Sequence, residues 1–149
     1  MPVDFIVSSL PTLAFNAPAP ISWEKFAETV GGVTVLSHLT MGFADLETQL
    51  RNAIAEARGG ERFKRPAEGC SLYWKNRILA CFQEKDVAKR EELLDRTWWD
   101  AAGELTPPSE PLGPGALATY AIRLKIALKR SLISKDAGNA SFDRLTAET

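Results

Sequence analysis

The sequence predicts an all-α protein: a compact helical bundle of five to seven helices, with an extended N-terminal segment. Apolar residues recur at helical spacing in several segments, which is typical of amphipathic helices. Glycine pairs and proline clusters separate these segments, as expected of the turns between helices. The chain has 149 residues, of which 45% are hydrophobic and 25% are charged. This composition excludes a disordered or fibrous chain and suits a single domain over 1–149 with one sizeable core.

Residues 1–21 are expected to form an extended arm. The stretch "DFIVSSLPTLAF" is apolar and rich in β-branched residues, and its Pro11 fits poorly in a helix or in a central strand. We therefore expect an extended segment with a short strand at 5–7. No basic region precedes the apolar residues, so we expect no signal peptide and a cytoplasmic protein.

Five segments after the arm have the pattern of helices. The first follows Ser22, a favourable N-cap residue, and ends at the glycine pair 31–32. Residues 33–40 fit a strand or a helix equally well, and 59–69 and 103–115 have the glycine and proline content of loops. The expected helices cover 23–30, 43–57, 71–82, 87–102 and 116–134, and a break at 135–141 precedes a short closing helix at 142–148 capped by Ser141.

The helix expected at 87–102 contains two adjacent tryptophans. Val87, Leu94, Trp98 and Ala101 recur at core spacing, which predicts that they are buried. Neighbouring residues on a helix point about 100° apart, so Trp99 is expected to lie to one side of that stripe. Trp99 is therefore a secondary candidate for a partner interface, because tryptophan is enriched at such positions.

The sequence contains no motif that indicates reaction chemistry. It lacks the glycine-rich motifs that bind phosphates or dinucleotides and the Gly-x-Ser-x-Gly nucleophile turn. Cys70 and Cys81 would lie roughly 16 Å apart on one helix, too far for a disulfide, and two cysteines with the lone His38 cannot complete a structural zinc site. We expect no catalytic site, no metal and no cofactor.

The overall charge and hydropathy also exclude several classes of partner. A formal net charge of -1 gives no general attraction to nucleic acid or to an anionic membrane. The basic run "RFKRP" lies between glutamates and lacks aromatic residues for base stacking, so it is interpreted as a solvated linker. No apolar run approaches the ~20 residues of a membrane span. We expect neither nucleic-acid binding nor direct insertion into a membrane.

The segment "LATYAIRLKIALKRSLIS" (117–134) carries the candidate partner surface. On a helix it has one wide apolar face, which includes Leu132, and a second isoleucine stripe on almost the opposite side. Either the helix is packed on both sides and its basic side chains reach out to solvent, or the isoleucine stripe meets a partner with an acidic-rimmed apolar groove. The candidate interface consists of Ile122, Ile126 and Ile133 with the basic residues Arg123, Lys125, Lys129 and Arg130.

Four blocks, in order along the chain, carry a family resemblance. They are "FIVSSLPTLAFNAPAPISWEKF" (5–26), "YWKNRILACF" (73–82), "REELLDRTWWDAAGEL" (90–105), and "LATYAIRLKIALKRSLIS" (117–134) followed by "GNASFDRL" (138–145). In these blocks the chain resembles a bacterial family of unknown function encoded with the rotary V/A-type ATPases, and through it the C/d-subunit family of those ATPases. Trp99 matches the family's tryptophan, which implies a structural role at the helix end.

The resemblance implies a non-enzymatic helical accessory or structural protein, without nucleotide or metal, whose partners are V/A-type ATPase subunits. It would be cytoplasmic and would reach the membrane only peripherally, through the ATPase complex. The alternative hypothesis is a small helical protein–protein interaction module unrelated to the ATPase, which could form a homodimer through the surface of Trp99 or Ile122.

Overall fold

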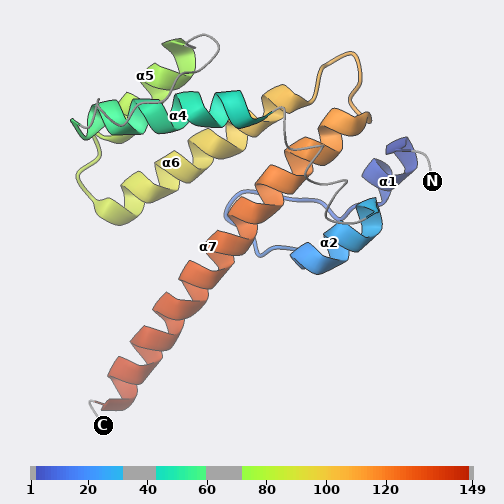
Figure 1. The fold of residues 1–149 in the computed structure, drawn as a ribbon. Helices are drawn as coiled ribbons and strands as arrows, with labels where there is room; N and C mark the ends of the chain where they lie inside the picture. The colour runs from blue at the N-terminus through green and yellow to red at the C-terminus, as the bar shows by residue number, and fades with distance from the viewer. Residues whose placement is uncertain (1–2, 32–42, 60–71, 148–149) are drawn as a thin grey trace.

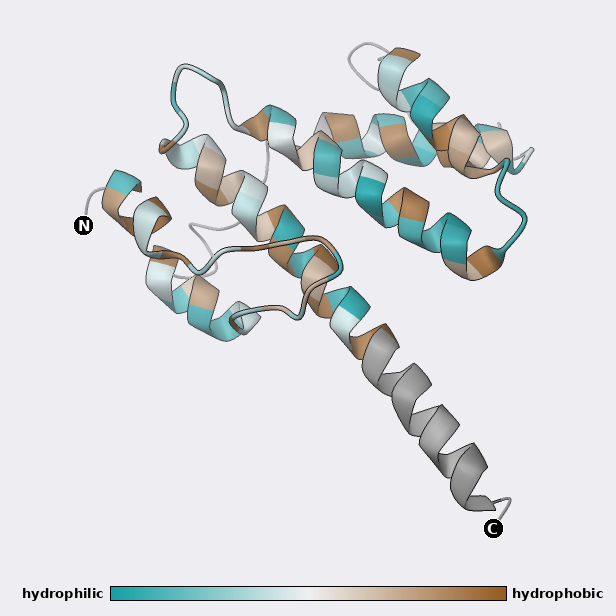
Figure 2. Cartoon of the chain, turned by 180° about the vertical axis from the view of Figure 1, so that it is seen from behind, coloured by the Kyte–Doolittle hydropathy of each residue, from teal (hydrophilic) through white to brown (hydrophobic). Residues whose placement is uncertain are grey.

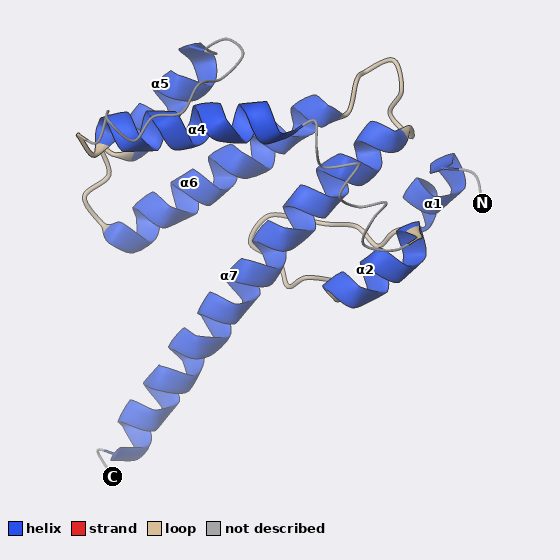
Figure 3. Cartoon of the chain, in the orientation of Figure 1, coloured by secondary structure: helices blue, strands red, loops and turns tan. Residues whose placement is uncertain are grey.

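The computed structural model describes residues 3–31, 43–59 and 72–147. These residues form six α-helices and one 3-10 turn, and none of them lies in a strand (Figure 3). The expected all-α class is thus confirmed. The elements are α1 (Val3–Ser9), α2 (Trp23–Val30), α4 (Ala44–Ala57), α5 (Leu72–Cys81), α6 (Val87–Ala102), η3 (Gly103–Leu105) and α7 (Pro114–Ala147). The segment 33–40, Cys70 and most of the loop expected at 59–69 lie outside the described residues.

Helix α7 runs through the centre of the molecule and separates two groups of helices (Figure 1). Helices α1 and α2 pack on one side of its N-terminal half, and α6 packs on the other side, with α4 and α5 stacked beyond it. Its C-terminal half extends away from both groups and ends at the C-terminus of the chain. A helix with two apolar faces is therefore used to join two layers.

Each side of α7 has its own hydrophobic cluster, and a third cluster joins them. The first lies among α4, α5 and α6 around Leu50, Ile78 and Leu94, and the second lies where α1 and α2 meet α7 around Phe26 and Leu124. Between them, Trp99 of α6 packs with Ile126 and Ala127 of α7. Figure 2 shows apolar residues, in brown, recurring along the part of α7 that lies between the two groups of helices.

Local sequence signals explain several helix ends. The Ser22 hydroxyl accepts a hydrogen bond from the backbone N–H of Lys25 and caps α2, which ends at Gly31 in the left-handed region with φ 106°. Asp86 caps α6 in the same way, through the backbone N–H of Lys89. Helix α7 starts at Pro114, inside the loop expected at 103–115, because proline fits the first position of a helix.

The strand expected at 5–7 is wrong, because these residues belong to α1. Ile6 is buried against α2 and α7, and Asp4 lies in the first turn, where a negative charge is favourable. The preference of β-branched residues for strands is weak and yields to this packing. The extended arm is thus shorter than expected and spans residues 10–21, a segment that we call the strap.

The break expected at 135–141 is also wrong, because α7 continues as one helix to Ala147. The expectation rested on Gly138 and on Ser141 as a new N-cap. A glycine in a helix interior costs only about 1 kcal/mol relative to alanine, and no proline follows to stop the helix. One glycine was therefore a weak reason to end α7.

The expected burial of the tryptophan pair is reversed. Trp99 is 6% exposed, whereas Trp98 is only half-buried, and Val87 is 61% exposed. Helix α6 is covered on two sides, so its buried positions do not form the single stripe that the spacing suggested. Leu132 of α7, expected on the core face, is 63% exposed, because the C-terminal half of α7 extends away from both groups of helices.

Candidate functional site

The basic residues of α7 that were predicted to rim a partner surface contact groups of the protein itself. Lys129 and Arg130 bind a carboxylate of α6, Arg123 binds a backbone carbonyl of α6, and the ammonium of Lys125 lies 4.9 Å from the centre of the Trp23 ring. The expected acidic, apolar partner of this face is thus supplied largely by α6 and by the N-terminal part of the same chain.

Asp95 of α6 is the centre of this contact. Its side chain is only 9% exposed and accepts hydrogen bonds from Lys129 Nζ at 2.5 Å and from Arg130 Nη1 at 3.0 Å. A buried carboxylate is tolerated only when charged donors satisfy it, and here two cations from successive positions of α7 do so. The contact holds the middle of α6 against α7.

Arg130 also binds the strap. Its Nε donates to the Asn16 side-chain oxygen at 3.1 Å, and its guanidinium carbon lies 4.9 Å from the centre of the Phe15 ring. Phe15 packs edge-on against Trp99 with ring centres 5.6 Å apart. A single arginine therefore joins α6, α7 and the strap.

Arg123 performs a similar task nearer the end of α6. Its Nε donates to the backbone carbonyl of Trp99 at 2.9 Å, and its guanidinium lies 5.4 Å from the centre of the Trp99 ring. Burial lowers the pKa of Arg123, and the nearby charge of Asp100 partly opposes that effect. Cations near a helix C-terminus satisfy carbonyls that the helix itself leaves unpaired, which explains the position of this arginine.

The isoleucine stripe is divided between the core and the surface. Ile122 is half-buried, Ile126 is 8% exposed beside Trp99, and Ile133 is 57% exposed. The structure thus brings Ile122, Ile126 and Trp99 together inside the molecule, where they offer little surface to a partner. Ile133, with its neighbour Leu132, lies apart on the extending half of α7.

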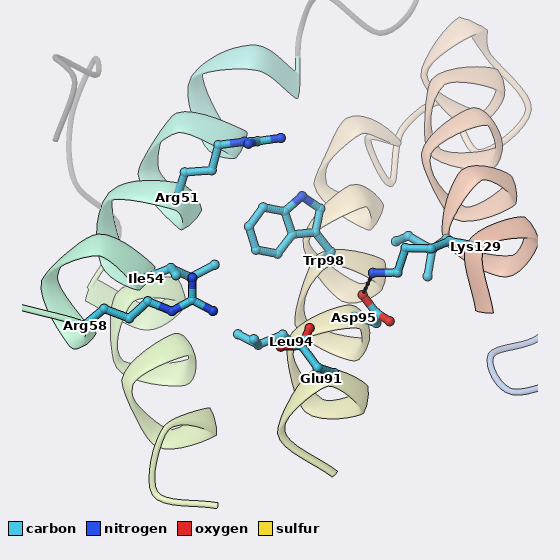
Figure 4. Close-up of a pocket in the computed structure, with 9 residues that line it drawn as sticks. Arg51, Ile54, Arg58, Glu91, Leu94, Asp95, Trp98 and Lys129 are labelled. Carbon is cyan, nitrogen blue, oxygen red and sulfur yellow. Dashed lines mark hydrogen bonds and ion pairs between the residues drawn. The ribbon is translucent and has the colours of Figure 1, made fainter. Parts of the chain in front are cut away.

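A pocket of about 420 Å³ lies where α4, α6 and α7 meet (Figure 4). Arg51 of α4 and Arg58, which directly follows α4, line it on one side, and Trp98 faces them from α6. The pair formed by Asp95 and Lys129 closes the side towards α7. The remaining lining residues are Ile54, Glu91, Leu94 and Ile126.

Sequence reasoning missed Arg51, Arg58 and Glu91 as members of one site. A signal was present, because Arg51, Ile54 and Arg58 have the spacing of one helix face, as do Glu91, Leu94 and Trp98. Nothing in the sequence showed that these two faces meet. No three His, Cys, Asp or Glu side chains among the described residues could hold a metal ion together. None of the described helices is long and apolar enough to cross a membrane.

Comparisons with protein-family models, with curated proteins and with solved structures find no match to this chain.

Proposed function

We propose that this protein is a non-catalytic helical accessory protein of a V/A-type rotary ATPase, and that it binds its partner through the extending half of α7, from Leu132 onward. Under this proposal it is cytoplasmic and reaches the membrane only through the ATPase complex. The observation that carries the proposal is the exposure of Leu132 and Ile133, at 63% and 57%, on a helix that extends from the body.

The position of these two residues supports binding rather than packing within the monomer. The strap contacts α7 at Ser131, whose hydroxyl accepts a hydrogen bond from the Ala19 backbone N–H at 3.4 Å. Residues 132–147 continue beyond it for about 24 Å at a rise of 1.5 Å per residue. Two adjacent apolar side chains at the base of such an extension are available to another protein.

The family resemblance supplies the identity of the partner in this proposal. The resembling blocks fall on α1 to α2, on α5, on α6 and on α7, in the order that the family has them. The continuous α7 departs from the family's turn near Gly138. The basic surface expected from the sequence plays a small part, since most of it is engaged internally.

The test is co-purification of the tagged full chain from the native organism, with ATPase subunits identified by mass spectrometry. We expect the wild type to recover them and the double variant Leu132→Asp/Ile133→Asp to lose them, because two charges would replace the apolar contact. Val87→Asp is the matched control, because Val87 is equally exposed, at 61%, on another helix. It should recover the subunits as the wild type does.

Ile126→Asp is unsuitable for this test, because it would bury an unpaired charge beside Trp99 and cost several kcal/mol. Recovery of no ATPase subunit by the wild type would contradict the proposal. If light scattering then gave the mass of a dimer that the double variant lost, the alternative of a self-associating interaction module would replace it.

A further inference from the structure

The pocket between α4, α6 and α7 has the size and composition of a small-molecule site. Its volume of about 420 Å³ lies within the range of roughly 300–1,000 Å³ that is typical of ligand pockets. Its lining consists of apolar side chains, among them the half-buried indole of Trp98, and a few charged groups. Such a lining suits a ligand with a flat apolar body and one polar end.

The charged residues of the pocket differ in whether another side chain already pairs with them. Within the lining, Asp95 pairs with Lys129, so these two side chains together carry no net charge. Arg51 pairs with Glu47 at 2.8 Å, and the Arg51 side chain is 71% exposed, so this pair is a weak surface contact. The guanidinium of Arg58 lies over the Phe82 ring at 5.6 Å, and no ion pair joins it to any of the described residues.

Because of Glu91, the two facing walls of the pocket differ in charge. It lines the wall formed by α6, whereas Arg51 and Arg58 line the wall formed by α4 (Figure 4). An anion is attracted to the arginine wall and repelled from Glu91, so the polar end of a ligand would face α4. The apolar part of the ligand would then lie against Trp98, Leu94 and Ile54.

We propose that this pocket binds a small aromatic or otherwise flat carboxylate, with the carboxylate on Arg58 and Arg51 and the ring against Trp98. Planar guanidinium groups match carboxylates through paired hydrogen bonds, and they also favour aromatic neighbours. The site is separate from the extending half of α7, so it does not depend on the proposed ATPase partner.

The proposal is tested by fluorine NMR of the full chain with trifluoromethylbenzoate as the probe and its neutral counterpart, trifluoromethylbenzamide, as the comparison. We expect saturable binding of the carboxylate and clearly weaker binding of the amide. Arg58→Gln should weaken binding of the carboxylate by about tenfold, because it removes a charge-assisted hydrogen bond. Glu91→Gln should strengthen it, because it removes a repelling charge from the opposite wall.

Lys85→Gln is the matched control, because it removes one positive charge from an exposed position that does not line the pocket. It should bind the carboxylate as the wild type does, and circular dichroism should show that every variant keeps its helix content. The proposal is overturned if the wild type shows no saturable binding, if the amide binds as tightly as the carboxylate, or if Lys85→Gln weakens binding as much as Arg58→Gln.

Discussion

At the scale of single residues, the two basic side chains that bind Asp95 have a sequence pattern typical of a binding surface, yet they make contacts within the protein. Lys129 and Arg130 have the exposed, basic character that suggests a partner, yet each contacts the carboxylate of α6. Their remaining exposure differs, at 52% for the Lys129 side chain and 25% for that of Arg130. The more buried arginine is also the one that contacts the strap.

Replacing Asp95 by Asn tests how much this contact contributes to the free energy of unfolding. The change keeps the shape of the side chain but removes its charge, so two charge-assisted hydrogen bonds weaken. Arg130 then keeps only the more distant carboxylate of Glu92, at 3.7 Å, as a counter-ion. We expect the free energy of unfolding, measured with urea, to fall by about 2 kcal/mol.

The matched control for this change is Glu47→Gln, which breaks the surface pair with Arg51. That pair is exposed, so its loss should cost less than about 1 kcal/mol. Equal losses for the two variants would mean that the Asp95 contact contributes no more than a surface ion pair.

The sequence predicted the chemistry of these residues but not their partners. The spacing of the basic residues on α7 follows from the helix period, and the two-sided character of that helix was one of the two interpretations offered. Which acidic residue they meet depends on how α6 lies across α7, and no local pattern encodes that crossing. For the same reason the sequence did not predict the pocket. Arg58 and Glu91 lie on different walls of it, and only the fold determines how the helices that form these walls are placed.

At the scale of elements, helices with a capping residue at the start and a glycine at the end were predictable. The N-cap at Ser22 and the left-handed Gly31 define α2 as expected. Errors arose where the local signal was weak against packing or helix propagation, as at residues 5–7 and at Gly138. Local signals therefore located a helix end where a capping residue or a left-handed glycine marks it, and they did not predict tertiary contacts.

Two glycines of α7 should respond oppositely to alanine. Gly115 lies where an added Cβ would overlap the backbone carbonyl oxygen of Leu105, so Gly115→Ala should lower the free energy of unfolding by about 2 kcal/mol or more. Gly138 lies inside the helix, where alanine is favoured by about 0.5–1 kcal/mol.

Amide hydrogen exchange measures the second effect. Gly138→Ala should slow exchange of the backbone amides that follow it, because it strengthens a continuous helix. Unchanged or faster exchange would argue for a turn at this position in place of the helix.

At the scale of the whole molecule, the strap and α7 hold together two groups of helices. Besides its contacts with Arg130 and Ser131, the strap is fixed at its start, where the Tyr120 hydroxyl donates to the Pro11 carbonyl at 2.7 Å. These contacts are spread along three turns of α7, so losing one of them should loosen the strap before the helix layers separate.

The Tyr120 contact predicts a loss of stability at alkaline pH. Burial raises the pKa of Tyr120 above its ordinary value of 10.0. The folded state therefore holds the phenol proton more tightly than the unfolded chain does. Its contribution to stability is complete below about pH 10 and is lost as pH rises through the raised pKa.

Urea unfolding across alkaline pH checks this prediction. Tyr120→Phe should be less stable near neutral pH by about 1 kcal/mol, because it lacks the hydrogen bond, but should lose less stability as pH rises. Tyr73→Phe is the control, since the Tyr73 ring is 63% exposed, and it should follow the wild type. An alkaline loss that is the same in Tyr120→Phe and in the wild type would assign it to other groups.

The length of α7 has a hydrodynamic consequence. A compact body from which residues 132–147 of α7 extend as a helical rod has a larger frictional coefficient than a sphere of the same mass, and it tumbles anisotropically. A monomer of this shape elutes from a gel-filtration column ahead of globular standards of its own mass, and so resembles a dimer there. Scattering or sedimentation equilibrium, which depend on mass rather than on shape, will report the monomer as a monomer.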